Sequence, residues 1–225
     1  MTFEECELLA RQGVPEAQYN FGLIFNTGKG VSKDYGEAAK WYRLSAEQGF
    51  AQAQTNLGLM YGKGQGVNQS YNEAFKWYQL AAGQGLAQAQ HNLGVLYSRG
   101  QGTLKDYEKA IKWFELAAKQ GYAQAQYNLG LMNSTGEGMV RNDKEAIKWY
   151  RLSAEQGVTG AQSNLGLMYE KGQGIEQDYI EAHKWFNIAG MNGNETGRKN
   201  TDIIEMKMTV GQIAIAAGLA RKWNR

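Results

Sequence analysis

The sequence has little cysteine, little proline, little net charge and no long apolar run. Its 225 residues include one cysteine, Cys6, and one proline, so there is no internal disulfide, and a metal site would need partners that are not evident. No apolar stretch approaches the length of a membrane span. Lys and Arg number 24 against 22 Asp and Glu, without the basic block that follows a phosphate backbone. We therefore expect no cofactor, no metal, no nucleic-acid binding and no membrane insertion.

The N-terminus leaves the compartment open. Residues 1–5, Met-Thr-Phe-Glu-Glu, carry acid where a signal peptide carries base. As written, the sequence predicts a cytoplasmic protein. If an N-terminal signal had been removed, the protein would instead be exported to the periplasm or secreted. The oligomeric state is not indicated either.

What the sequence does have is a strict internal repeat. Its 29 glycines occur almost without proline, which argues against disorder and collagen and for glycine at fixed structural positions. Tryptophans recur every 36 residues, each followed by an aromatic residue: Trp41, Trp77, Trp113, Trp149 and Trp185. An Asn-x-Gly motif, a Gly-x-Gly motif and a closing glycine keep the same step. Self-similarity of this period is typical of a solenoid.

Each repeat predicts two helices. The first runs from about Ala17 to Thr27 and ends at Gly28, since glycine suits a left-handed C-cap. The second begins after a capping residue at one fixed place: Asp34, Ser70, Asp106, Asn142 and Asp178. Glutamate three residues later in four repeats resembles a capping box. Gly-x-Gly follows a helix and recurs five times, so a turn is favoured over a phosphate loop.

Two sets of residues are expected inside. The tryptophans are interpreted as core. A glycine within each first helix, such as Gly22, indicates close helix approach, and alanines of the second helix, such as Ala38, are the expected neighbours.

The pattern Asn-Leu-Gly-Leu-Met-Tyr at residues 56–61, then Gly-x-Gly, then Ala-x-x-Trp resembles the Sel1-like repeat (SLR) family, which is related to the tetratricopeptide repeats. The resemblance implies an all-α, right-handed α-solenoid. It places a half repeat or cap at residues 1–16 and five repeats at 17–193, with bounds 17–52, 53–88, 89–124, 125–160 and 161–193. A capping region follows at 194–225, with one helix near 210–223. Thr209 and Gln212 form its capping box, and Ile213, Ala217, Ala220 and Trp223 make one apolar stripe.

The resemblance also implies an adaptor or assembly role, and bacterial members are often exported. Disulfide-linked members are cysteine-rich, and this chain departs from them. By analogy with tetratricopeptide repeats, the first helices line a concave groove. Residues that point away from the expected core are the candidate partner-binding residues: Tyr19, Leu23, Thr55, Asn56, Leu59, Lys63, His91, Asn92, Val95, Arg99, Tyr127, Asn128, Leu131 and Lys171.

The asparagine at one position of every first helix, as in Asn56, has two interpretations. Its amide could hold a bound peptide at the edge of the groove. It could instead bond to the next repeat, and its presence in all five repeats favours this second interpretation, since buried polar groups need partners.

No catalytic constellation is evident. His91 and His183 occupy different repeat positions, and each is interpreted as a single polar surface residue. We expect a non-enzymatic adaptor or scaffold that binds a protein or peptide. A dedicated inhibitor or immunity protein against a toxin or hydrolase is the alternative, and a hydrolase is a distant one.

Overall fold

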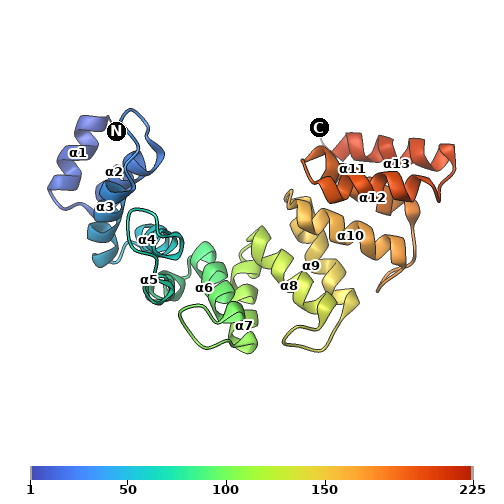
Figure 1. The fold of residues 1–225 in the computed structure, drawn as a ribbon, viewed down its shortest axis with the longest axis horizontal. Helices are drawn as coiled ribbons and strands as arrows, with labels where there is room; N and C mark the ends of the chain where they lie inside the picture. Colours follow the sequence, from blue (N-terminus) through green and yellow to red (C-terminus); the bar gives the residue numbers. More distant parts are fainter. Residues whose placement is uncertain (1, 224–225) are drawn as a thin grey trace. The chain divides into compact units, whose positions relative to one another are not determined.

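The computed structural model describes residues 2–223, which form thirteen α-helices and no strand (Figure 1). Before the repeats comes α1 (Phe3–Arg11). The first helices of the five repeats are α2 (Pro15–Thr27), α4 (Ala51–Lys63), α6 (Ala87–Arg99), α8 (Ala123–Thr135) and α10 (Thr159–Lys171). The second helices are α3 (Tyr35–Glu47), α5 (Tyr71–Gly83), α7 (Tyr107–Lys119), α9 (Asp143–Glu155) and α11 (Tyr179–Met191). Two more helices follow, α12 (Glu195–Glu205) and α13 (Val210–Trp223). The predicted all-α solenoid is confirmed.

The helices form two compact units, Met1–Ala117 and Ala118–Arg225, and the division falls within α7. In the first unit α2 packs on α3 and α4 on α5, and α3 and α5 also pack on the first helix of the following repeat. In the second unit α8 packs on α9 and α10 on α11 in the same way. Among the described helices none has both the length and the apolar character needed to cross a membrane.

The helix ends confirm the predicted caps but not the capping boxes. The side chains of Asp34, Ser70, Asn142 and Asp178 accept backbone N–H bonds at the starts of their helices, and Asp106 accepts from the N–H of Lys109. The glutamates do not reach back to the caps. Glu73, for example, accepts from the ammonium of Lys76, one turn further along. An opposite charge on the adjacent turn draws the carboxylate away from the cap.

Glycine within the first helices is required first by an aromatic ring, and in three repeats the backbone carbonyl of the expected alanine is also close, as that of Ala38 is to Gly22. A Cβ on Gly58 would lie 2.8 Å from the ring of Tyr78, so the ring occupies the space that a side chain would need. The second glycine of Gly-x-Gly has a different reason. Gly66 has φ +67°, and a Cβ there would collide with the carbonyl oxygen of Tyr35 in the preceding repeat. The expected close approach is real, but ring and backbone produce it.

The core position is the aromatic residue after each tryptophan. Tyr42, Tyr78, Phe114, Tyr150 and Phe186 are all buried. Of the five repeat tryptophans only Trp185 is buried, at 3% exposed. The other four are half-buried. Trp41, for instance, contacts Phe21 on the first helix of its own repeat with 5.0 Å between ring centroids, and Trp77 packs against a core cluster that includes Ala38 and Tyr42 of the preceding repeat. The expectation of a tryptophan core is therefore wrong for four repeats.

A ladder of buried glutamines, which the sequence analysis missed, links helices of neighbouring repeats. Gln54 on α4 donates from Nε2 to the carbonyl of Ala46 at 3.1 Å, and its Oε1 accepts from Gln84 at 2.8 Å. The same bonds recur at Gln18, which donates to Ala10 and accepts from Gln48. The signal was available, since glutamine recurs every 36 residues at this place. Each amide thus satisfies a buried backbone carbonyl, as interiors require.

The C-terminal region holds one helix more than predicted. α12 packs on α11 in the place of a sixth first helix, with Ile204 buried in the core of the second unit. α13 packs back on α11 (Figure 1). Thr209 and Gln212 form the expected capping box at its start. Of the predicted stripe, Ala220 is buried, Ile213 and Ala217 are half-buried, and Trp223 contacts Trp185; Ala216 is a further buried position that was not predicted.

Candidate functional site

A small pocket opens between successive first helices in the first unit. It has a volume of about 210 Å³ and lies among α4, α5 and α6. Leu59 and Val95 supply apolar side chains, and Lys63 and Arg99 supply exposed positive charge. Tyr78, the core aromatic of the repeat, lies in the wall. The pocket therefore combines an apolar floor with a basic mouth.

The second unit repeats this pocket in the same register. Its volume is about 310 Å³, and Leu131, Leu167 and Lys171 occupy positions 72 residues beyond Leu59, Val95 and Arg99. Tyr150 again lies in the wall. Helix geometry explains the recurrence, since residues three or four apart share one face and every first helix presents the same two positions.

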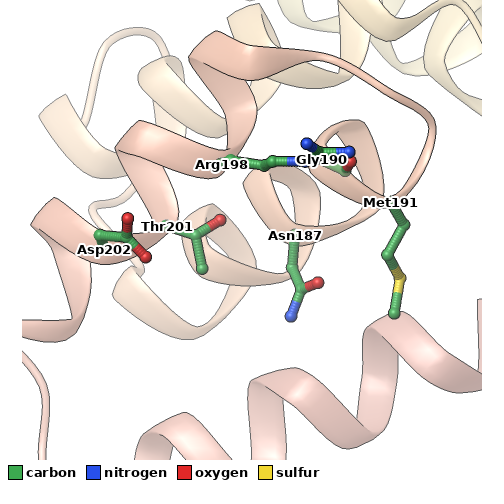
Figure 2. Close-up of a pocket in the computed structure, with 6 residues that line it drawn as sticks. All are labelled: Asn187, Gly190, Met191, Arg198, Thr201 and Asp202. Carbon is green, nitrogen blue, oxygen red and sulfur yellow. Dashed lines mark hydrogen bonds between the residues drawn. The ribbon is translucent and has the colours of Figure 1, made fainter.

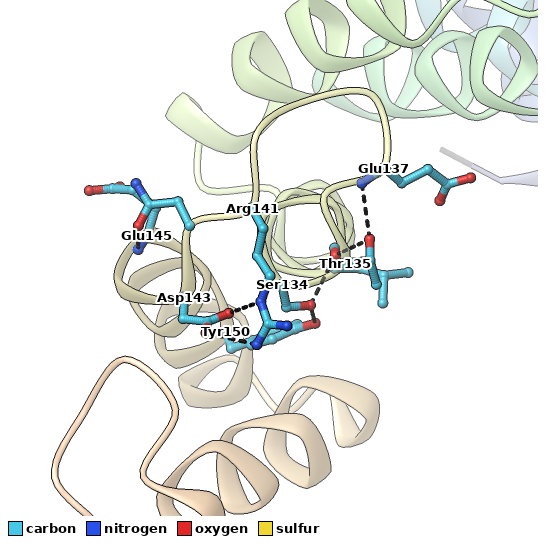
Figure 3. A network of polar contacts seen from close by, with 9 residues as sticks. Ser134, Thr135, Glu137, Arg141, Asp143, Glu145 and Tyr150 are labelled. Carbon is cyan, nitrogen blue, oxygen red and sulfur yellow. Dashed lines mark hydrogen bonds and ion pairs between the residues drawn. The ribbon is translucent and has the colours of Figure 1, made fainter.

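Polar contacts organise the wall of the pocket in the second unit (Figure 3). The hydroxyl groups of Ser134 and Tyr150 lie 2.8 Å apart. Arg141 donates two bonds of 2.8 Å to the carboxylate of Asp143, so its charge is neutralised within the repeat. Lys171 is the cation at this pocket that forms no ion pair within residues 2–223.

The repeated asparagines influence the pKa of buried tyrosines in the preceding repeat. Burial raises the pKa of Tyr42 to about 12, and the side chain of Asn56 acts in the opposite direction. Burial likewise raises the pKa of Tyr150, offset by hydrogen bonds from Ser134 and Asn164. Asn56 and Asn164 therefore lie beside tyrosines of the preceding repeat, whereas the sequence analysis expected a bond to the next repeat.

The structure brings together about half of the candidate residues. The pockets of the two units are lined by Leu59, Lys63, Asn92, Val95, Arg99, Leu131 and Lys171. Three others pack on rings of second helices at centroid distances of 5.8, 5.7 and 6.1 Å: Tyr19, His91 and Tyr127. Asn128 is half-buried. Thr55 is a correction, because it is 1% exposed and its hydroxyl donates to Ala51 in its own helix.

Leu23 lies in a larger pocket at the N-terminal end of the first unit. This pocket measures about 610 Å³ and lies between α1 and α2. Cys6 lines it at the register position that holds Tyr42 one repeat later, so a small side chain replaces a large ring. The thiol is buried and donates to the carbonyl of Ala17 at 3.6 Å, and burial raises its pKa. A raised pKa disfavours the reactive thiolate.

A fourth pocket lies beside α11 and α12, with a volume of about 440 Å³ (Figure 2). Asn187, Met191 and Asp202 line it. Arg198, which Figure 2 shows beside Gly190, donates to the carbonyl of Gly190 at 3.0 Å. The lining holds no nucleophile paired with a base.

The two histidines differ from the sequence expectation. His91 is half-buried, and burial and the positive charge of Arg99 lower its pKa, while its contact with Asn92 acts the other way. His183 is fully buried and lies 2.8 Å from Glu205, so its interpretation as a surface residue is wrong. The two lie on different helices, α6 and α11. Within residues 2–223 no group of three His, Cys, Asp or Glu side chains could hold a metal ion.

Comparison with known families places the repeats in one class. The Sel1 repeat model matches residues 15–50, 51–86, 87–122, 123–158 and 159–194. No curated protein matches the chain significantly. The match covers both pockets between first helices.

Solved structures give the same picture. A protective antigen of uropathogenic Escherichia coli with an SLR fold is 39% identical, with a TM-score of 0.90 over 95% of this chain and 46% of that chain; the present chain thus spans about half of that relative. A Sel1 repeat protein from Oxalobacter formigenes is 40% identical, with a TM-score of 0.76 over 84% of this chain and 77% of that one. An immunity protein from Pseudomonas aeruginosa shares the fold at 23% identity and a TM-score of 0.57, over 86% of this chain and 74% of its own.

Proposed function

The chain belongs to the Sel1 repeat family, and from that premise we propose that it binds a partner protein through an acidic segment with apolar anchors, seated in the pockets between first helices. Sel1 repeat proteins generally mediate protein–protein interaction, and the fold is typically a non-enzymatic scaffold. The chain would then act as an adaptor or scaffold.

The carrying observation is a contrast in how the lysines are neutralised. In four of the five repeats one lysine on the second helix is paired with the glutamate three residues earlier, as in Lys76 with Glu73 and Lys148 with Glu145. The pocket cations Lys63, Arg99 and Lys171 form no ion pair within residues 2–223. Unpaired positive charge beside an apolar floor favours a partner that brings carboxylates and apolar side chains together.

A peptide array tests this. The wild-type chain is expected to select peptides that combine Asp or Glu with Leu or Phe. The Lys63→Glu and Arg99→Glu double variant should keep its helicity and lose about tenfold in affinity for those peptides at low salt, equivalent to about 1.4 kcal/mol. The loss should shrink as salt rises, because exposed charges are screened.

The matched control reverses the same amount of charge on second helices, at Lys76 and Lys112. Both are exposed, and this double variant should bind the selected peptides as the wild type does. If it abolishes binding while the first-helix variant does not, the partner occupies another face.

An inhibitor or immunity role remains the alternative for the same surface. The immunity protein of Pseudomonas aeruginosa shares the fold. At this level of identity the likeness concerns the fold and does not identify a partner for the present chain. The two roles differ in partner range. An adaptor should select a class of peptides, whereas an inhibitor should bind one toxin or hydrolase and abolish its activity in a mixed assay.

A further inference from the structure

The second helices carry an exposed apolar strip that the pockets do not use. Leu44, Leu80, Leu116 and Leu152 are 45%, 53%, 44% and 44% exposed, although a single exposed leucine would be unremarkable. Each follows a half-buried tryptophan by three residues, so the two share one side of the helix. We call the four Trp-x-x-Leu pairs the Trp-Leu strip. Its residues are Trp41, Leu44, Trp77, Leu80, Trp113, Leu116, Trp149 and Leu152.

The fifth repeat shows the same strip covered. Trp185 and Ile188, which occupy these two positions on α11, are 3% and 0% exposed. The lysine that precedes the tryptophan is also more buried in the fifth repeat. The side chain of Lys184 is 15% exposed, whereas that of Lys40 in the first repeat is 71% exposed. A whole face of α11 is therefore withdrawn from water.

Helix α13 is the difference between the fifth repeat and the others. In every unit a following first helix packs on the second helix, as α4 does on α3 and α10 does on α9, yet Leu44 and Leu152 remain exposed. Among the second helices within residues 2–223, α11 is the one that also packs closely against α13 (Figure 1). The rings of Trp185 and Trp223 lie 5.2 Å apart, and Ala220 belongs to the same core cluster as Trp185 and Ile188.

The face that α13 presents defines the chemistry of an occupant. Ala216 and Ala220, one turn apart, are its fully buried residues, and Ile213 is half-buried beside them. Small side chains allow two helices to approach closely, since the interaxial distance depends on the residues at the contact. Trp223 adds an aromatic contact one turn beyond Ala220.

We propose that the Trp-Leu strips of α3, α5, α7 and α9 are docking sites for an amphipathic helix of a partner protein, with alanines four residues apart on its docking face and an aromatic residue one turn later. α13 is the internal example of that helix on the fifth repeat. The strips lie on second helices, so this surface is separate from the pockets between first helices.

The probe is a fluorescein-labelled synthetic peptide of residues 209–223, titrated into the intact chain and followed by fluorescence anisotropy. We expect saturable binding. Replacing Leu44, Leu80, Leu116 and Leu152 by glutamate should weaken it at least tenfold while circular dichroism stays unchanged, because these side chains are already exposed. Ala216→Glu together with Ala220→Glu in the peptide should have a similar effect.

Two controls separate the strip from general hydrophobicity and from the pockets. Leu104 and Val140 are 87% and 90% exposed and lie outside the helices, so their replacement by glutamate should leave peptide binding unchanged. The Lys63→Glu and Arg99→Glu variant should also bind the peptide normally. Failure of the pocket proposal and failure of this one therefore give different results.

Three results would overturn the proposal. One is the absence of saturable binding to the wild-type chain. A second is binding that the four leucine replacements do not weaken. A third is binding at one site per chain that persists in the four-leucine variant. The peptide would then be replacing α13 on α11, and the strips of the other repeats would not bind it.

Discussion

The fifth repeat and the four before it use one sequence pattern in two ways. Trp149 on α9 is half-buried and Leu152 is exposed, whereas Trp185 and Ile188 on α11 are buried. The helix that follows within the repeat register is present in both cases, as α10 and as α12. What differs is α13, which adds a second layer over α11. Burial at these positions is thus decided by a neighbour outside the repeat.

This difference shows that a strict sequence period tells which residues occupy equivalent positions in the repeats, but does not tell which of those positions are buried. Tryptophan recurs every 36 residues and packs on core clusters while it stays half-buried, as Trp77 does on a cluster that includes Tyr42 of the preceding repeat. The next residue, Tyr42 or Phe186 for example, points inward and is buried in every repeat. A large apolar residue at a repeated position can therefore serve an interface between repeats while half of it remains accessible.

The largest expected effect compares the two tryptophans of the second unit. Trp185→Ala should reduce the free energy of unfolding by about 3–5 kcal/mol, as for large buried truncations. Trp149→Ala should cost roughly half of that or less, because part of its ring is already in water. Urea denaturation followed by circular dichroism measures both. Equal costs would mean that α13 adds nothing to the burial of Trp185.

The fold was largely predictable because the repeat fixes several kinds of position at once. Glycine at a left-handed C-cap, as at Gly28, and a polar N-cap, as at Asp34, mark helix ends through local chemistry. α12 was missed because it lacks the Asn-x-Gly motif that marks the other first helices. It carries Thr201 and Asp202 where they have a leucine or phenylalanine and then a glycine. Its packing on α11 depends on tertiary contacts that no short motif records.

The sequence predicted which positions face the candidate site, but it did not predict how deeply each side chain is buried. Helical periodicity placed Leu59, Val95 and Arg99 on one side, and the structure brings these three to one pocket. Periodicity could not separate Thr55, which is buried, from Tyr19 one repeat earlier, which is half-buried. The exposed leucines of the second helices also escaped, because a leucine after a tryptophan is expected to join the core.

One histidine, His183, lies in the fifth repeat, which α13 covers, and the other, His91, lies in a repeat that α13 does not cover. We expect the larger effect on stability from the contact of His183. His183 occupies the position of Ile147, its Nδ1 has no partner, and its Nε2 contacts Glu205. Glu205→Ala would leave both ring nitrogens buried and unpaired, so it should cost about 1–3 kcal/mol. In a His183→Ile background, which copies the preceding repeat, Glu205→Ala should cost close to nothing.

The measurement is a double-mutant cycle in urea denaturation. A Glu205→Ala cost that is the same with histidine and with isoleucine at position 183 would show that the contact contributes nothing. The carboxylate would then act only through solvent or through α12 itself.

The smallest expected effect concerns His91, in a repeat that α13 does not cover. Burial and Arg99 lower the pKa of His91 in the folded chain, whereas the unfolded chain keeps a pKa of about 6.5. Between these two values the unfolded chain takes up a proton that the folded chain does not, so acidification favours unfolding. Stability should therefore fall as the pH decreases from about 7 through 6.5, and the contribution of His91 should be constant above that range. His91→Tyr should remove this part of the pH dependence. The variant copies Tyr127 of the next repeat, whose ring packs on Tyr150 as the ring of His91 packs on Phe114. Urea midpoints at several pH values, taken as the difference between the two chains, isolate the effect from other titrating groups. A difference that grows toward high pH would contradict a lowered pKa for His91.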